Sequence, residues 1–138
     1  MGRAAVRLLL DTHIWLWSHT DPDRLGRRLA RALEDPSTEL WLSPISVWEF
    51  LILAERKRVR LPRRTTPAEW VDTALARVPM DEAALNREVA LRSRAVVLAH
   101  DDPADRFLAA TADVYDLVLA TADRRLLAGR GFRTMPNR

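Results

Sequence analysis

Short apolar runs separated by longer amphipathic stretches dominate the hydrophobic pattern of this chain. Each apolar run has the length of one buried β-strand and is followed by polar or turn-forming residues. The pattern predicts strands at residues 6–10, 39–42, 117–120 and 132–135, the last of them at a sheet edge. Because strands that alternate with helices are typical of a parallel sheet, we expect an α/β fold.

Capping signals and apolar residues at helical spacing predict the helices between these strands. Three starts combine a capping side chain with proline at the first helical position: Ser43-Pro44, Thr66-Pro67 and Asp102-Pro103. The predicted helices cover residues 13–21, 25–33, 44–58, 67–76, 81–94, 103–115 and 124–128, with a basic connector at 57–64. No linker or repeat divides the chain, so we expect residues 1–138 to form a single domain.

Four carboxylates are predicted to lie at one edge of the sheet. Asp11 and Asp123 directly follow predicted strands, and Glu49 and Asp105 fall in the first or second turn of predicted helices. The functional crevice of a parallel α/β sheet lies beyond the carboxyl ends of its strands, where these residues should meet. For Asp105 alone a second reading stays open, since an acidic residue in the first turn also complements the helix dipole.

Four like charges in one crevice require a cation. At an effective dielectric constant of about 20 each close pair repels by several kcal/mol. Hard oxygen ligands without Cys favour Mg²⁺ or Mn²⁺ over Zn²⁺, and such a site suits in-line hydrolysis of a phosphodiester. Thr12 and Thr121 are natural partners for a ligand carboxylate or a water, although local capping explains their hydroxyls equally well.

The composition indicates a cellular compartment, and the charge indicates a class of binding partner. The chain is 48% hydrophobic, contains no Cys, and has no apolar run near the ~18 residues of a membrane helix. No cleavable signal is visible at residues 1–7, so we expect a cytoplasmic protein without a membrane partner. If four of the 19 acidic residues form one pocket, 15 remain elsewhere. Together with the 22 basic residues they give the rest of the molecule a net charge of +7. Such a charge suits a nucleic acid partner.

Four motifs in a fixed order resemble a known family. They are Leu-Leu-Leu-Asp-Thr-His-Ile-Trp-Leu-Trp at 8–17, Ser-Pro-Ile-Ser-Val-Trp-Glu at 43–49, His-Asp-Asp-Pro-Ala-Asp-Arg at 100–106 and Thr-Ala-Asp at 121–123. The chain resembles the PIN-domain ribonucleases and, more narrowly, the VapC toxins of bacterial type II toxin–antitoxin pairs. This resemblance covers nearly the whole chain. It implies a PIN-like three-layer α/β fold, in which helices flank a short central parallel sheet.

The resemblance also implies a function. In that family the positions of Asp11, Glu49, Asp105 and Asp123 form the catalytic Mg²⁺ site, with Mn²⁺ as the alternative ion. It further implies RNA cleavage, a homodimer, and inhibition by a VapB-like antitoxin whose tail covers the active-site groove. Two other functions stay open, an RNA-processing PIN nuclease without an antitoxin and a catalytically silent RNA-binding or interaction module.

The turn at residues 57–60 departs from the family pattern. Many relatives have Gly after the helix that carries the Trp-Glu pair, whereas Lys57-Arg58-Val59-Arg60 stands here. The form of this turn, and any substrate contact made in it, is therefore left open. The metal site does not depend on it.

Several residues near the acids have competing interpretations. Arg106, Arg124 and Arg125 could hold a substrate phosphate, but salt bridging explains Arg106 at least as well. We interpret Asp102 as a helix cap and Asp101 as solvated. His13 and His100 are left out of the catalytic set, because a bound metal already supplies the base.

The tryptophans could stack on unpaired RNA bases. Trp17 and Trp48 occupy helical positions typical of a core, so we interpret both as structural. Trp70 follows the basic connector and is the better candidate for an exposed partner or dimer surface.

Overall fold

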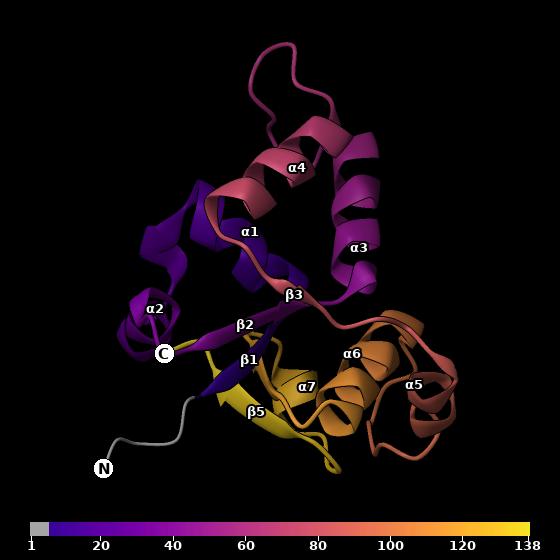
Figure 1. The fold of residues 1–138 in the computed structure, drawn as a ribbon. Coiled ribbons are helices and arrows are strands. Elements are labelled where there is room, and N and C mark those ends of the chain that lie inside the picture. The colour runs from indigo at the N-terminus through magenta and orange to yellow at the C-terminus, as the bar shows by residue number, and fades with distance from the viewer. Residues whose placement is uncertain (1–5) are drawn as a thin grey trace.

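The computed structural model describes residues 6–138 and contains a five-stranded, fully parallel sheet (Figure 1). The strand order is β3-β2-β1-β4-β5, with β1 in the centre. The strands are β1 (Arg7–Leu10), β2 (Glu39–Leu42), β3 (Asp81–Glu82), β4 (Val118–Thr121) and β5 (Arg133–Pro136). The α/β class and the parallel sheet predicted from the sequence are confirmed. The expected absence of a signal concerns in part residues 1–5, which lie outside the described residues.

Helices cover both faces of this sheet. They are α1 (Thr12–Thr20), the 3-10 turn η1 (Pro22–Arg24), α2 (Arg27–Glu34), α3 (Pro44–Glu55), α4 (Pro67–Arg77), α5 (Arg87–Arg92), α6 (Pro103–Val114) and α7 (Arg124–Leu127). Figure 1 shows α1, α3 and α4 on one side of the sheet and α5 and α6 on the other. Within residues 6–138 no helix is long and apolar enough to cross a membrane.

The central strand supplies both hydrophobic cores, because successive side chains of a strand point to opposite faces. Leu8 and Leu10 pack into the core under α1, α3 and α4, and Leu9 packs into the core under α5 and α6. All three leucines are completely buried. Because both faces of β1 are buried, its last three residues are all apolar and do not alternate with polar ones.

Side-chain caps fix the starts of the helices that lead into the site. The Ser43 side chain accepts a hydrogen bond from the backbone N–H of Ile45, and the Asp102 side chain accepts one from that of Ala104. Thr66 and Glu69 form the reciprocal capping box at the start of α4. These three predicted helix starts are confirmed.

The helix predicted at residues 81–94 is wrong in its first half. Asp81 and Glu82 pair with Trp41 and Leu42 and form the edge strand β3. The helix starts only at α5, where the Asn86 side chain accepts the N–H of Val89. Asp81 therefore caps no helix, because its backbone belongs to the sheet.

Two tryptophan assignments are also wrong. Trp48 is 54% exposed on the outer face of α3. Trp70 packs in a cluster of aromatic rings, stacked on Phe50 at 4.5 Å between centroids and edge-on to Trp15 at 5.4 Å. The apolar spacing of α3 and α4 predicts helices but does not distinguish which aromatic side chain faces the core.

Candidate active site

The four predicted acids line one cavity at the carboxyl end of the sheet. This acid cavity has a volume of about 390 Å³. Its walls are formed by Asp11, His13, Trp17, Glu49, Asp102, Asp105, Ala122, Asp123 and Arg125. Strands β1 and β4 pair in register, so the residues that follow them emerge side by side.

Thr121 links the two acids that follow the strands. Its hydroxyl donates to Asp11 Oδ2 at 2.6 Å and accepts the backbone N–H of Asp123 at 3.0 Å. Asp11 caps α1 through Thr12 N–H, and Asp123 caps α7 through Arg125 N–H, both at 2.8 Å. One buried hydroxyl and two caps therefore orient this pair of carboxylates.

Glu49 is held by the other predicted threonine. The Thr12 hydroxyl donates to Glu49 Oε1 at 2.7 Å, and Thr12 itself is 1% exposed. Glu49 reaches the cavity because it lies on α3, which begins directly after β2. Each predicted threonine thus contacts a predicted carboxylate.

Asp105 is buried at the start of α6 and is held by a histidine. His100 Nε2 lies 2.6 Å from Asp105 Oδ2, and Asp105 is 7% exposed. Asp102 caps the helix as predicted and also lines the cavity. The sequence interpretation left His100 out of the set. Its only signal was its position five residues before Asp105, and the loop path that brings the two together is not evident from the sequence.

The environment of the cavity raises the pKa of three of its carboxylates. Burial raises the pKa of Asp11, of Asp105 and, to about 7, of Glu49. The neighbouring acids act in the same direction, because Asp11 and Asp105 each raise the pKa of Glu49. Hydrogen bonds from Thr121, Thr12 and His100 oppose these effects only in part.

Asp123 differs from the other three acids. Burial alone would raise its pKa, but hydrogen bonds and charge from Arg125 outweigh burial, so the pKa of Asp123 is lowered. The Arg125 guanidinium lies 3.2 Å from Asp123 and 3.9 Å from Asp105. Arg125 is therefore the cation that this chain itself brings to the acid cavity.

Of the two interpretations left open for Arg106, the structure shows the salt bridge. Its Nε donates to Asp101 at 3.1 Å, and its Nη1 donates to the carbonyl oxygens of Ser93 and Val96. Its side chain is 15% exposed. Through these hydrogen bonds it joins the segment before α6 to the helix. Arg125 is better placed to contact a phosphate at the acids.

The donor set suits a hard divalent cation, because it consists of carboxylate oxygens whose mutual repulsion a cation would relieve. In the part of the chain from residue 6 onward, no group of three or more acidic or histidine side chains lies close enough together to hold a metal ion. Mg²⁺ usually takes only one or two protein carboxylates and completes its shell with water and phosphate. The carboxylates present fit such an open site.

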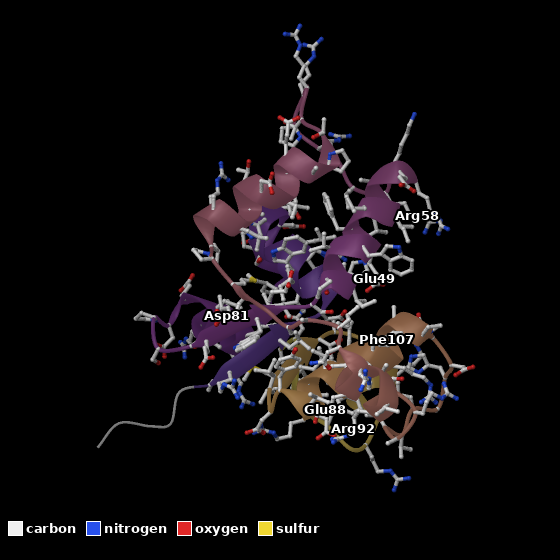
Figure 2. All side chains as sticks on the ribbon, turned by 45° about the vertical axis from the view of Figure 1, so that its right-hand side comes forward. Glu49, Arg58, Asp81, Glu88, Arg92 and Phe107 are labelled. Carbon is white, nitrogen blue, oxygen red and sulfur yellow. The ribbon has the colours of Figure 1, made fainter. Side chains whose placement is uncertain are left out.

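An apolar groove of about 730 Å³ adjoins the acid cavity. It lies between α3 and α6, and Figure 2 shows Glu49 and Phe107 on its two sides. Exposed Trp48 belongs to its wall, and Glu49 and Asp102 line both the groove and the acid cavity. The acids thus lie at the end of a surface that could bind an apolar side chain.

A family model for the PIN domain matches residues 8–130. The chain belongs to the PIN domain family. This PIN domain is similar to Ribonuclease VapC22 of Mycobacterium tuberculosis, with 32% identity over 124 residues, 89% of this chain and 92% of that relative. The resemblance to the VapC group inferred from the four motifs is confirmed.

Solved structures share the fold of this PIN domain. VapBC2 from Rickettsia felis, bound to a promoter DNA fragment, matches with a TM-score of 0.70 at 13% identity. VapBC from Salmonella typhimurium, bound to DNA, matches with a TM-score of 0.67 at 17% identity. In both comparisons the match covers 95% of this chain and 98% of the other. At these identities the likeness establishes the PIN-like α/β fold.

Proposed function

We propose that this PIN domain is a divalent-metal-dependent endoribonuclease that acts as the toxin of a VapBC-type pair. The observation that carries the proposal is the convergence of four carboxylates from four separate elements on one cavity. Three of them have a raised pKa, as expected where a cation is needed to stabilise ionised acids. The similarity to a relative named a ribonuclease supports the choice of RNA as substrate.

Asp11 and Asp105 would be the strongest ligands of Mg²⁺, or of Mn²⁺ in its place, and Glu49 and Asp123 would complete the site directly or through water. When bound, this ion activates a water for attack on a phosphodiester and neutralises charge on the phosphate. Thr121, Thr12 and His100 orient three of the four carboxylates. Arg125 can donate to a substrate phosphate from the rim of the cavity.

A VapB-like antitoxin is the proposed protein partner. The apolar groove beside the acids, with the exposed Trp48, offers a surface for an apolar peptide segment. A segment bound there would also cover Glu49 and Asp102 and so block the acid cavity. We further propose a homodimer that acts in the cytoplasm.

The nuclease proposal is tested with Asp11→Asn and Asp105→Asn. Both changes remove a charge and keep the side-chain size, and Asn also caps helices, so the fold should be retained. We expect the wild type to cleave total RNA with Mg²⁺ and to stop when a chelator is added. Each variant should lose more than about 100-fold in cleavage rate, because removing partners of metal ligands alone typically costs 10–100-fold.

Asp72→Asn is the matched control, because Asp72 is exposed on α4 and lines neither the acid cavity nor the apolar groove. It should cleave RNA like the wild type. Full cleavage by both Asp11→Asn and Asp105→Asn would overturn the assignment. RNA binding that needs neither metal nor the acids, without cleavage, would indicate a silent RNA-binding module.

A further inference from the structure

A second cavity lies beside the acid cavity, and nothing in the proposed chemistry uses it. Its volume is about 840 Å³, and its wall contains Arg24, Arg58, Arg60 and Arg77, so we call it the arginine cavity. His13 and Trp17 of α1 line both cavities. A molecule that occupies one can therefore continue into the other.

The arginine cavity has the opposite charge to its neighbour. Asp21 is the one carboxylate in its wall, against four guanidinium groups. Among the residues from 6 to 138, no carboxylate lies within ion-pair distance of these four arginines. Their charge is not neutralised inside the described chain, so the cavity attracts anions.

Trp17 holds Arg24 in a defined orientation. The Arg24 guanidinium carbon lies 4.4 Å from the centroid of the Trp17 ring. Such stacking fixes the plane of the guanidinium and leaves the N–H donors at its edge free. These donors have the geometry that suits a phosphate.

Helix α3 connects the two cavities. Glu49 lies within this helix and lines the acid cavity, whereas Arg58 and Arg60 follow its end and line the arginine cavity. Figure 2 shows Arg58 beyond the end of α3, with Glu49 nearer the sheet on the same helix. One of the acids and two of the four arginines are thus arranged along one segment of the chain.

We propose that the arginine cavity binds the single-stranded RNA segment next to the scissile phosphate. Arg24, Arg58 and Arg60 bind its phosphates, while the partly buried Trp17 holds the Arg24 guanidinium in place. A single strand fits because its unstacked bases can enter a cavity that a duplex cannot. This inference rests on the proposed function, since it takes RNA as the substrate of the neighbouring acids.

RNA is favoured over an acidic peptide by the shared walls. A strand that places one phosphate at the acids carries further phosphates, at regular intervals, past His13 and Trp17 to the arginines. An acidic peptide in the arginine cavity carries no phosphodiester on which the adjoining acids and their ion could act.

The test measures RNA binding separately from cleavage. In an Asp105→Asn background with a chelator present, a fluorescent single-stranded RNA of mixed sequence is titrated at several salt concentrations. Arg24→Ala and Arg58→Ala should each weaken binding roughly tenfold, about 1.4 kcal/mol, because each removes a charged hydrogen bond to a phosphate. Each should also reduce the slope of log K against log[salt] by about 0.7, the value for one lost phosphate contact on a single strand.

Arg27→Ala is the matched control. It removes the same charge from an exposed residue of α2 that lines neither cavity. It should retain the affinity and the salt slope of the parent. In the active chain, Arg24→Ala should raise KM for RNA and leave kcat unchanged, because the arginine contributes to binding and not to chemistry.

The outcomes separate this inference from the proposed function. If Arg24→Ala and Arg58→Ala bind like Arg27→Ala while the wild type cleaves RNA, the arginine cavity is not a binding site and the nuclease proposal stands. If the arginine-dependent binding occurs but Mg²⁺ never yields cleavage, the nuclease proposal alone fails. Equal binding of duplex RNA, or tight binding of poly-glutamate to the same arginines, would overturn the assignment to single-stranded RNA.

Discussion

The Thr121 hydroxyl donates to the Asp11 carboxylate and accepts the backbone N–H of Asp123, so its removal should weaken metal binding and cleavage. Thr121→Val keeps the shape of this completely buried side chain but leaves Asp11 without the 2.6 Å hydrogen bond. We expect Mg²⁺ affinity and RNA cleavage to fall by about 10–100-fold, the usual effect of losing a group that orients a metal ligand. Titration of the apo protein with Mg²⁺, followed by its melting temperature, measures the first effect.

Thr111→Val is the control for this change. Thr111 is also completely buried, but its hydroxyl bonds to the Phe107 carbonyl within its own helix. Both variants should lose about 1 kcal/mol of stability, the net contribution of a hydrogen bond. Equal loss of cleavage in the two variants would mean that Thr121 acts only on stability.

Glu49 gives the apo protein a pH-dependent stability. The pKa of Glu49 is about 7 in the folded chain, against an ordinary value of 4.5. Between these values the folded chain keeps a proton that the unfolded chain has lost, so the free energy of unfolding falls as pH rises from about 4.5 to about 7. With a chelator present, Glu49→Gln should exceed the wild type in stability above pH 7, by up to about 3 kcal/mol.

The difference between Glu49→Gln and the wild type should disappear below pH 4.5, where Glu49 is protonated in both states. Urea unfolding across this pH range measures it. Glu55→Gln, an exposed site at the end of the same helix, should show no such pH-dependent gain. A gain for Glu49→Gln that is independent of pH would exclude the ionisation of Glu49 as its cause.

The acidic residues could be predicted one by one because their positions depend on local signals. Asp11 and Asp123 follow strands directly, and Asp105 follows a cap-and-proline start. His100, by contrast, contacts Asp105 through an irregular loop, and Arg106 is drawn away by the carbonyls of Ser93 and Val96. Contacts that depend on loop geometry could not be predicted from residue type and spacing.

At the scale of elements, the end of α3 resolves the departure from the family pattern. Lys57 adopts a left-handed backbone with φ of 55°. Its N–H donates to Ala54 and that of Arg58 donates to Leu53, which together form a Schellman motif. The turn therefore has the form that glycine favours, with lysine in the glycine position, and α3 ends at Glu55 and not at residue 58.

Lys57→Gly should stabilise the protein. A residue with a side chain in the left-handed region is strained by roughly 1–2 kcal/mol relative to glycine. Glycine removes this strain, but it loses more conformational entropy on folding, which cancels part of the gain. We expect a net gain of about 0.5–1 kcal/mol in the free energy of unfolding, measured by denaturant titration. Lys57→Ala removes the same charge but keeps the β-carbon, so it should show no comparable gain.

Helices could be predicted from the sequence where nearby residues, such as caps, determine where they begin. The starts of α3, α4 and α6 were predicted from caps within a few residues. The strand β3 was missed because Asp81 and Glu82 are extended only through pairing with β2, some forty positions away in the chain. A two-residue polar edge strand has no hydrophobic pattern of its own.

At the scale of the whole molecule, charge is separated along one surface. Five acids line one cavity and four arginines line the next, and His13 and Trp17 of α1 belong to both walls. The convergence of the acids could be predicted, since parallel strands bring their carboxyl ends to one edge. The arginine cavity could not, because it depends on how the connector after α3 folds back against α1.

The hydrogen bond between Thr121 and Asp11 joins residues 110 positions apart in the chain. During synthesis on the ribosome, Asp11 emerges long before β4 exists to pair with β1. A growing chain therefore lacks both Asp123 and the hydroxyl that orients Asp11 until β4 and the residues directly after it are made. The four predicted carboxylates therefore cannot meet in one cavity before β4 has been made and has paired with β1.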